Sequence, residues 1–101
     1  MQIVNTSAVF PSIKDAAQTP QDIPVTFPAA VTQAAAILTG FDVQFTRSDG
    51  DHHLGQLDVR LNTAPPNGNT VTVTVNFDLR DWSGDRDDKY QGEVFFSVIG
   101  E

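Results

Sequence analysis

Cysteine is absent from this chain of 101 residues, so neither a disulfide nor a thiolate metal site can stabilise it. Basic residues are scarce: six Lys and Arg stand against thirteen Asp and Glu, which gives a net charge of −7. That charge opposes binding to nucleic acid or to an anionic membrane, because both attract proteins through phosphate groups. No apolar run approaches the ~20 residues of a membrane-spanning helix. These absences exclude a nucleic-acid-binding or membrane-inserted protein and leave the compartment open.

Two further features are missing. The segment MQIVNTSAVF lacks the basic and apolar regions of a secretion signal, so work outside the cell would require lysis, another export route or a larger particle. Helix-forming runs are nearly absent, whereas Val, Thr and Phe are prominent and six Pro and seven Gly supply turns. The composition predicts an all-β protein, and the length predicts one domain, residues 1–101.

The clearest pattern is NTVTVTVNFDLR at residues 69–80, where apolar and polar residues alternate strictly. A period of two predicts a β-strand with one apolar and one polar face. The apolar face needs a partner sheet, which the other segments must supply. Weaker patterns predict five more strands, at residues 1–10, 23–27, 34–46, 55–62 and 90–99. Six strands at hairpin spacing predict a six-stranded antiparallel β-sandwich, with a small closed barrel as the alternative.

Local details refine this prediction. Three prolines within residues 11–24 indicate a long loop of the kind that is often functional, and Pro24 restricts its strand to an edge. Gly40 indicates a bulge in a strand whose apolar residues share one parity, namely Ala35, Ile37, Phe41, Val43 and Phe45. Asn67 and Gly68 predict a tight turn before the alternating strand.

The last strand is apolar on both faces. Val94, Phe96 and Val98 form one face and Phe95 and Ile99 the other. One face belongs to the core of the domain. The other face is covered by the N-terminal segment or another tail of the chain, meets a neighbouring subunit, or stays uncovered. The first two are favoured, since a monomer tolerates only a limited apolar patch.

The sequence offers no catalytic signature. It has no G-x-S-x-G stretch, and its carboxylates lie on strand exteriors and loop tips rather than among apolar residues that would raise a pKa. We therefore expect no enzyme and no cofactor. Two clusters contain oxygen or imidazole ligands for a cation: SDGDHH at residues 48–53 and SGDRDDK at residues 83–89. In the first, adjacent histidines point in opposite directions on a strand, and in the second Arg86 and Lys89 neutralise the carboxylates. No metal site is predicted.

Trp82 differs from these candidates. A single Trp in a loop of Asp, Arg, Ser and Gly provides a flat apolar surface beside carboxylates. The C–H face of a sugar ring packs on such an aromatic side chain, while Asp and Arg bind the hydroxyl groups. The alternative is that Trp82 caps the end of the core.

The chain resembles a known family in its order of segments. The segments are Val25-Thr26-Phe27, AAAILTGFDVQF, LDVRLN before a glycine turn, the alternating strand ending in Asp81-Trp82, and the aromatic-rich residues 90–98. Over residues 23–100 this order resembles the H-type lectin domain of snail agglutinins and discoidins. The resemblance implies a six-stranded sandwich that assembles as a trimer and binds galactose or N-acetylgalactosamine at clefts between subunits.

The resemblance also implies a set of site residues. Trp82 would be the aromatic residue of the sugar site, Tyr90 its neighbour and Asp85 the acid that follows the Trp. An acidic residue of the N-terminal loop would be Asp22 or Asp15. The family's arginine at the start of the fourth strand is replaced here by Gly55-Gln56.

Two functions are therefore open. The first is a glycan-binding lectin that gains avidity as a homo-oligomer. The second is a structural or assembly domain of a phage tail, fibre or bacterial surface particle that binds no sugar. The sequence leaves the location of this soluble chain unknown; a place outside the cell or on a particle, reached without a classical signal peptide, is compatible with both functions.

Overall fold

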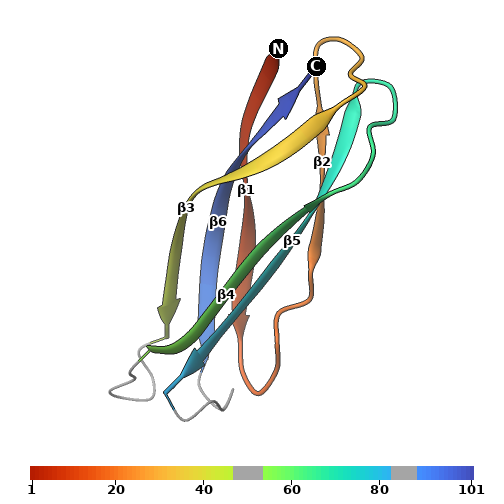
Figure 1. Ribbon diagram of the computed structural model, residues 1–101. Helices are drawn as coiled ribbons and strands as arrows, with labels where there is room; N and C mark the ends of the chain where they lie inside the picture. The colour runs from red at the N-terminus through yellow and green to blue at the C-terminus, as the bar shows by residue number, and fades with distance from the viewer. Residues whose placement is uncertain (47–53, 83–88) are drawn as a thin grey trace.

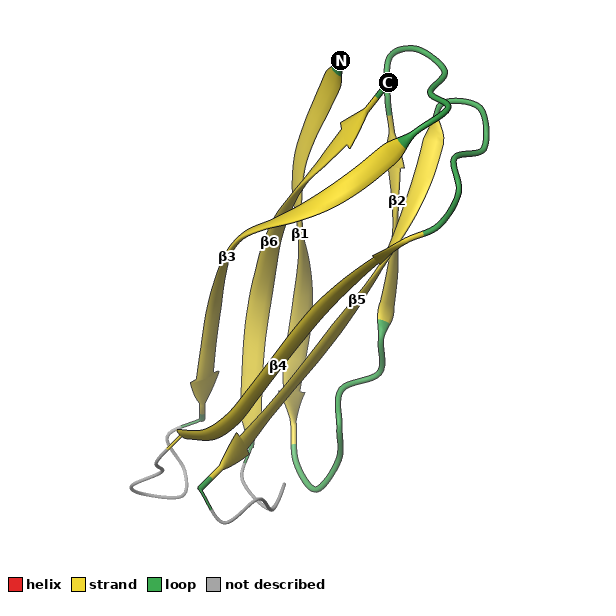
Figure 2. Cartoon of the chain, viewed as in Figure 1, coloured by secondary structure: helices red, strands yellow, loops and turns green. Residues whose placement is uncertain are grey.

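The computed structural model describes residues 1–46, 54–82 and 89–101 (Figure 1). Within these residues the chain forms six β-strands and no helix (Figure 2). The strands are β1 (Gln2–Ile13), β2 (Gln21–Thr26), β3 (Ala34–Phe45), β4 (Leu54–Thr63), β5 (Thr70–Asp81) and β6 (Tyr90–Gly100). The predicted all-β class is confirmed, and the predicted strands all form with small differences in their ends.

The strands form two sheets of three strands each in the described part of the chain. β6 lies between β1 and β3 in one sheet, and β5 lies between β2 and β4 in the other. We call them the β6 sheet and the β5 sheet. All four pairings are antiparallel, and the two sheets pack against each other through one apolar core. The predicted β-sandwich is confirmed; the alternative of a closed barrel is wrong, because the sheets remain separate.

β5 is the central strand of its sheet and shows the alternation read from its sequence. Its inward side chains are all buried: Val71, Val73, Val75, Phe77 and Leu79. Each contributes about 1.5–3 kcal/mol through burial of apolar surface. The Phe77 ring meets Phe10 at 5.3 Å and Tyr90 at 5.5 Å between ring centroids, which joins the two sheets through aromatic contacts.

β3 contains the bulge predicted at Gly40, with a consequence that the alternation alone does not reveal. Its pairing with β6 shifts register between Leu38 and Gly40. The extra residue reverses which parity faces the core, so Ile37 is exposed whereas Val43 packs against the core. The expectation that the apolar residues of this strand share one face is therefore wrong.

β6 has the two apolar faces expected from its sequence. Val94, Phe96 and Val98 are buried between the sheets, whereas the Phe95 side chain remains 38% exposed on the outer face. β1 lies beside β6 in the same sheet, with Ser7 opposite Phe95, and does not cross over it. The alternative in which the N-terminal segment covers this face is wrong.

The connection between β1 and β2 is shorter than the predicted loop at residues 11–24. β1 continues through Pro11 to Ile13, and β2 already begins at Gln21. β1 is an edge strand, and its register shifts between Phe10 and Ile13, so Pro11 interrupts no central ladder. Pro24 likewise lies in an edge strand, as predicted. The connection itself is residues 14–20.

The sandwich is elongated, and its two ends differ. Gln2 pairs with Gly100, so both chain termini lie at one end, together with the turn around Gly68 (Figure 1). Gly68 has a φ of 63°, a left-handed conformation that glycine adopts without strain, and the predicted turn is confirmed. β4 begins and β5 ends at the opposite end, where Leu54 pairs with Asp81.

Candidate functional site

Trp82 lies at the end of the sandwich that is remote from the termini, directly after β5. Its side chain is 73% exposed, so it does not cap the core. The neighbouring strand comes unusually close: a Cβ built on Gly55 would lie 1.9 Å from the Asp81 carbonyl oxygen and 2.7 Å from the Trp82 Cα. Only glycine fits at this position without a backbone shift, and the close packing holds the backbone that carries the indole.

A row of polar side chains leads along the outer face of β5 to Trp82. The row consists of Asn76, Asp78 and Arg80, which alternate with the buried residues of the strand. β4 supplies the opposite row, with Arg60 beside Asn76, Asp58 beside Asp78 and Gln56 beside Arg80. The outer face of this part of the β5 sheet therefore presents amide, carboxylate and guanidinium groups side by side.

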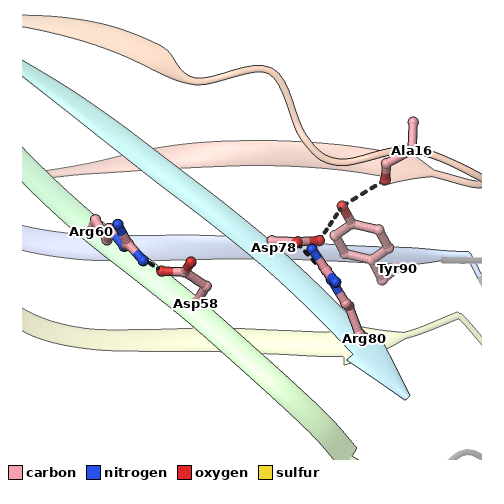
Figure 3. A network of polar contacts seen from close by, with 6 residues as sticks. All are labelled: Ala16, Asp58, Arg60, Asp78, Arg80 and Tyr90. Atoms are coloured by element: carbon pink, nitrogen blue, oxygen red, sulfur yellow. Dashed lines mark hydrogen bonds and ion pairs between the residues drawn. The ribbon is translucent and has the colours of Figure 1, made fainter. Parts of the chain in front are cut away.

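Ion pairs hold these side chains in place (Figure 3). The Arg80 Nε donates to Asp78 Oδ2 at 3.1 Å, and the Arg60 Nε donates to Asp58 Oδ1 at 2.9 Å. The first pair is the better sheltered, with side chains 30% and 18% exposed, whereas Arg60 is 71% exposed. An exposed ion pair contributes little to stability, so these pairs chiefly orient the guanidinium and carboxylate groups.

The loop of residues 14–20 forms one wall of a hollow beside this row. The hollow has a volume of about 320 Å³ and is lined by Ala17, Gln18, Pro20, Asp58, Asn76, Phe77 and Asp78. Gln18 is buried, and its Nε2 donates to the Pro11 carbonyl oxygen at 2.7 Å, which ties the loop to the end of β1. The hollow combines the carboxylate and amide groups of Asp58, Asn76 and Asp78 with an apolar wall of Ala17, Pro20 and Phe77.

Tyr90 approaches the same place from inside the sandwich. Its side chain is fully buried, and its hydroxyl donates to the Ala16 carbonyl oxygen at 2.9 Å (Figure 3). The hydroxyl also lies 3.3 Å from Asp78 Oδ1. Tyr90 thus links the loop to the polar row, and in the single chain its ring offers no face to a ligand.

The remaining predicted site residues lie elsewhere. Asp22 accepts a hydrogen bond from the Thr74 hydroxyl at 2.6 Å and lies opposite Thr74 in the β5 sheet. Thr74 precedes Trp82 by eight positions, which corresponds to about 26 Å along a strand, so one chain does not bring Asp22 and Trp82 together. Asp15, the other acidic candidate, lies in the loop with a φ of 63°. Asp85 falls outside the described residues.

The described residues contain neither a cluster of metal ligands nor a membrane-spanning helix. The clusters at residues 48–53 and 83–88 fall outside the described residues. In the rest of the chain no three His, Asp or Glu side chains gather as a metal site would require. The described residues contain no helix that could cross a membrane.

Comparison with known proteins adds no assignment. No family model, curated protein or solved structure matches this chain. Its function must therefore be inferred from the site itself.

The sequence pattern singles out Trp82 but not the polar row or the hollow. A signal was present: the polar face of β5 carries threonines at 70, 72 and 74 and then changes to Asn76, Asp78 and Arg80 as it approaches Trp82. The contribution of Gln18 had no such signal, because it depends on how the loop folds back over the sheet.

Proposed function

We propose that this protein is a carbohydrate-binding domain whose site is centred on Trp82 and the polar row of β5. The observation that carries the proposal is the 73% exposed indole at the end of a strand whose outer face bears Asn76, Asp78 and Arg80. The C–H face of a sugar ring would pack on the indole, and the carboxylate, guanidinium and amide would bind its hydroxyl groups. We assign no reaction to the site.

The position of Arg80 bears on the preferred sugar. The H-type lectin domain, which this chain resembles, has an arginine at the start of its fourth strand, where this chain has Gly55-Gln56. Arg80 lies directly opposite Gln56 in the pairing of β4 with β5. A guanidinium therefore reaches the same part of the sheet from the neighbouring strand. We accordingly propose galactose or N-acetylgalactosamine as ligand, bound at subunit clefts of a homotrimer whose several weak sites act together.

Titration calorimetry with galactosides and N-acetylgalactosaminides tests this proposal. We expect binding by the wild-type protein, a loss of at least tenfold in affinity for Trp82→Ala and a smaller loss for Trp82→Phe, which keeps an aromatic face. Val9→Ala is the matched control, because it truncates another exposed apolar side chain on the other sheet and should leave affinity unchanged. The absence of binding to every such ligand by the folded protein, or undiminished binding by Trp82→Ala, would contradict the proposal.

A second candidate function is that of a structural or assembly domain of a phage tail, fibre or bacterial surface particle. It is favoured by the exposed apolar residues Ile37 and Phe95 on the outer face of the β6 sheet. For this function we expect self-association that Trp82→Ala leaves intact, together with no response to sugars. Both functions fit a protein located outside the cell or on a particle.

A further inference from the structure

The outer face of the β6 sheet contains a continuous surface without charge. Three rows run across its strands: Ile3 with Ile99 and Ala35, Asn5 with Ser97 and Ile37, and Ser7 with Phe95 and Gly40. We call these nine residues the uncharged face. Its large apolar side chains remain open to solvent, with Ile3 58%, Ile37 48% and Phe95 38% exposed. Such a grouping in a single chain marks a surface for association.

The polar side chains of the uncharged face bond among themselves and with its border. The Ser97 hydroxyl donates to Asn5 Oδ1, and the Ser7 hydroxyl donates to Glu93 Oε2 at 2.7 Å. Removing water costs less free energy for polar groups that already have hydrogen-bond partners in the protein. The Phe95 ring lies over Gly40, at 4.0 Å from the position of a Cβ there. A hollow of about 240 Å³ lies beside Ala35 and Ile99 at one end of the face.

The distribution of charge favours another copy of this chain as the partner. Each copy carries a net charge of −7, so two copies repel wherever carboxylates come within about 10 Å. The outer face of the β5 sheet carries charges of both signs, namely the carboxylate of Asp22 and the ion pairs of Asp58 with Arg60 and of Asp78 with Arg80. The uncharged face carries no charged side chain, and the row that borders it beyond Phe95 consists of Val9, Glu93 and Asp42. Contact through the uncharged face therefore keeps the carboxylates at the border, as in interfaces with an apolar centre and a polar rim.

The size of the outer face is also sufficient. β6 has eleven residues, which extend over about 36 Å, and three strands at a spacing of about 4.8 Å are about 14 Å wide. The uncharged face spans residues 95–99 of β6, about 17 Å, and so covers about half of this area. With its polar border included, the outer face has a flat area of about 500 Å² for each copy and about 1,000 Å² for two. Specific interfaces begin near that size, so we expect association of modest, micromolar strength.

We propose that copies of this chain associate through the uncharged face, with β6 sheet against β6 sheet. This deepens the homo-oligomer of the proposed function by naming the surface that joins its copies, and it does not depend on the identity of the sugar. A two-fold dimer satisfies it with the two uncharged faces in full contact, and the area above applies to this case. A closed trimer satisfies it with the three uncharged faces turned toward a common axis.

Multi-angle light scattering and sedimentation equilibrium test the proposal over about 1–200 μM protein. We expect the wild-type mass to rise from the 11.0 kDa of one chain to a fixed multiple of it. Ile37→Glu places a carboxylate in the middle row of the uncharged face, on the edge strand β3. Like charges brought together there repel, so its dissociation constant should rise at least about a hundredfold. Asn62→Glu adds the same charge to the outer face of the β5 sheet and should leave the mass unchanged.

Two controls keep the outcome clear. Circular dichroism melting shows whether Ile37→Glu folds, and Ile37→Thr, which keeps a β-branched side chain, should weaken association by about tenfold without a charge. A wild-type protein that stays at 11.0 kDa up to 200 μM, or a folded Ile37→Glu that associates as the wild type does, would overturn the proposal. Sugar titration of the same samples separates the two proposals, since Trp82→Ala should lose sugar binding and keep the wild-type mass.

Discussion

Removal of the Tyr90 hydroxyl tests how the loop of residues 14–20 is held against the polar row. Tyr90→Phe keeps the buried ring but deletes the donor that serves Ala16 at 2.9 Å and Asp78 at 3.3 Å. The longer contact is weak, and Asp78 keeps its pair with Arg80, so most of the loss falls on the half-buried carbonyl of Ala16. We expect the free energy of unfolding to fall by about 1–2 kcal/mol, because a carbonyl shielded from water loses its partner.

Urea denaturation followed by far-ultraviolet circular dichroism measures this change, and each kcal/mol should lower the melting temperature by roughly 4–8 °C. Amide hydrogen exchange should also become faster in residues 14–20. The matched control is Thr74→Val, which deletes a hydroxyl that donates to a carboxylate at an exposed site, Asp22, and should cost less than about 0.5 kcal/mol. Equal stability of Tyr90→Phe and the wild type, with unchanged exchange in the loop, would refute the reasoning.

Two glycine substitutions give further predictions. Gly92→Ala should lower the free energy of unfolding by about 1–3 kcal/mol, because its Cβ would lie 2.7 Å from Val43 Cγ1 and 3.0 Å from the Phe77 ring. Gly40→Ala, whose Cβ meets only Phe95 at 4.0 Å, is its control and should change stability little; equal losses in urea denaturation would contradict the packing argument. Gly68→Ala should lower the free energy of unfolding by about 1 kcal/mol because of its φ of 63° alone, since nothing lies within 4 Å of the added Cβ. A variant more stable than the wild type would show that the turn adopts another backbone conformation.

The fold could be predicted from the sequence where local pattern and burial agree. The alternation in β5 requires a partner sheet, and the row Val94, Phe96 and Val98 of β6 offers an apolar face to pack against it, so a sandwich follows from these two strands. β3 shows where such reasoning fails. The bulge before Gly40 adds one residue, and a shift of one residue exchanges the two faces of a strand, so Ile37 points outward although Val43 of the same parity packs inward.

The candidate site was less predictable, because it depends on contacts between distant segments. Trp82 could be singled out by its neighbours in sequence. The hydrogen bond of Tyr90 to Ala16 joins residues 74 positions apart, and no local pattern indicates it. No local pattern indicates the hollow beside Asn76 either, because the loop that forms its wall comes from a distant part of the sequence. The prolines predicted a loop over residues 11–24, whereas the loop covers only residues 14–20.

The placement of the chain termini has a practical consequence. The two chain ends lie at one extremity of a body 49 Å long (Figure 1). Trp82 directly follows the end of β5 at the other extremity, where Leu54 pairs with Asp81. A biotin, a fluorophore or a fused protein attached at either terminus would project away from the indole. A domain immobilised on a sensor surface through such a tag would have its Trp82 end directed toward the solution. Molecules that bind at Trp82 would therefore have free access to it.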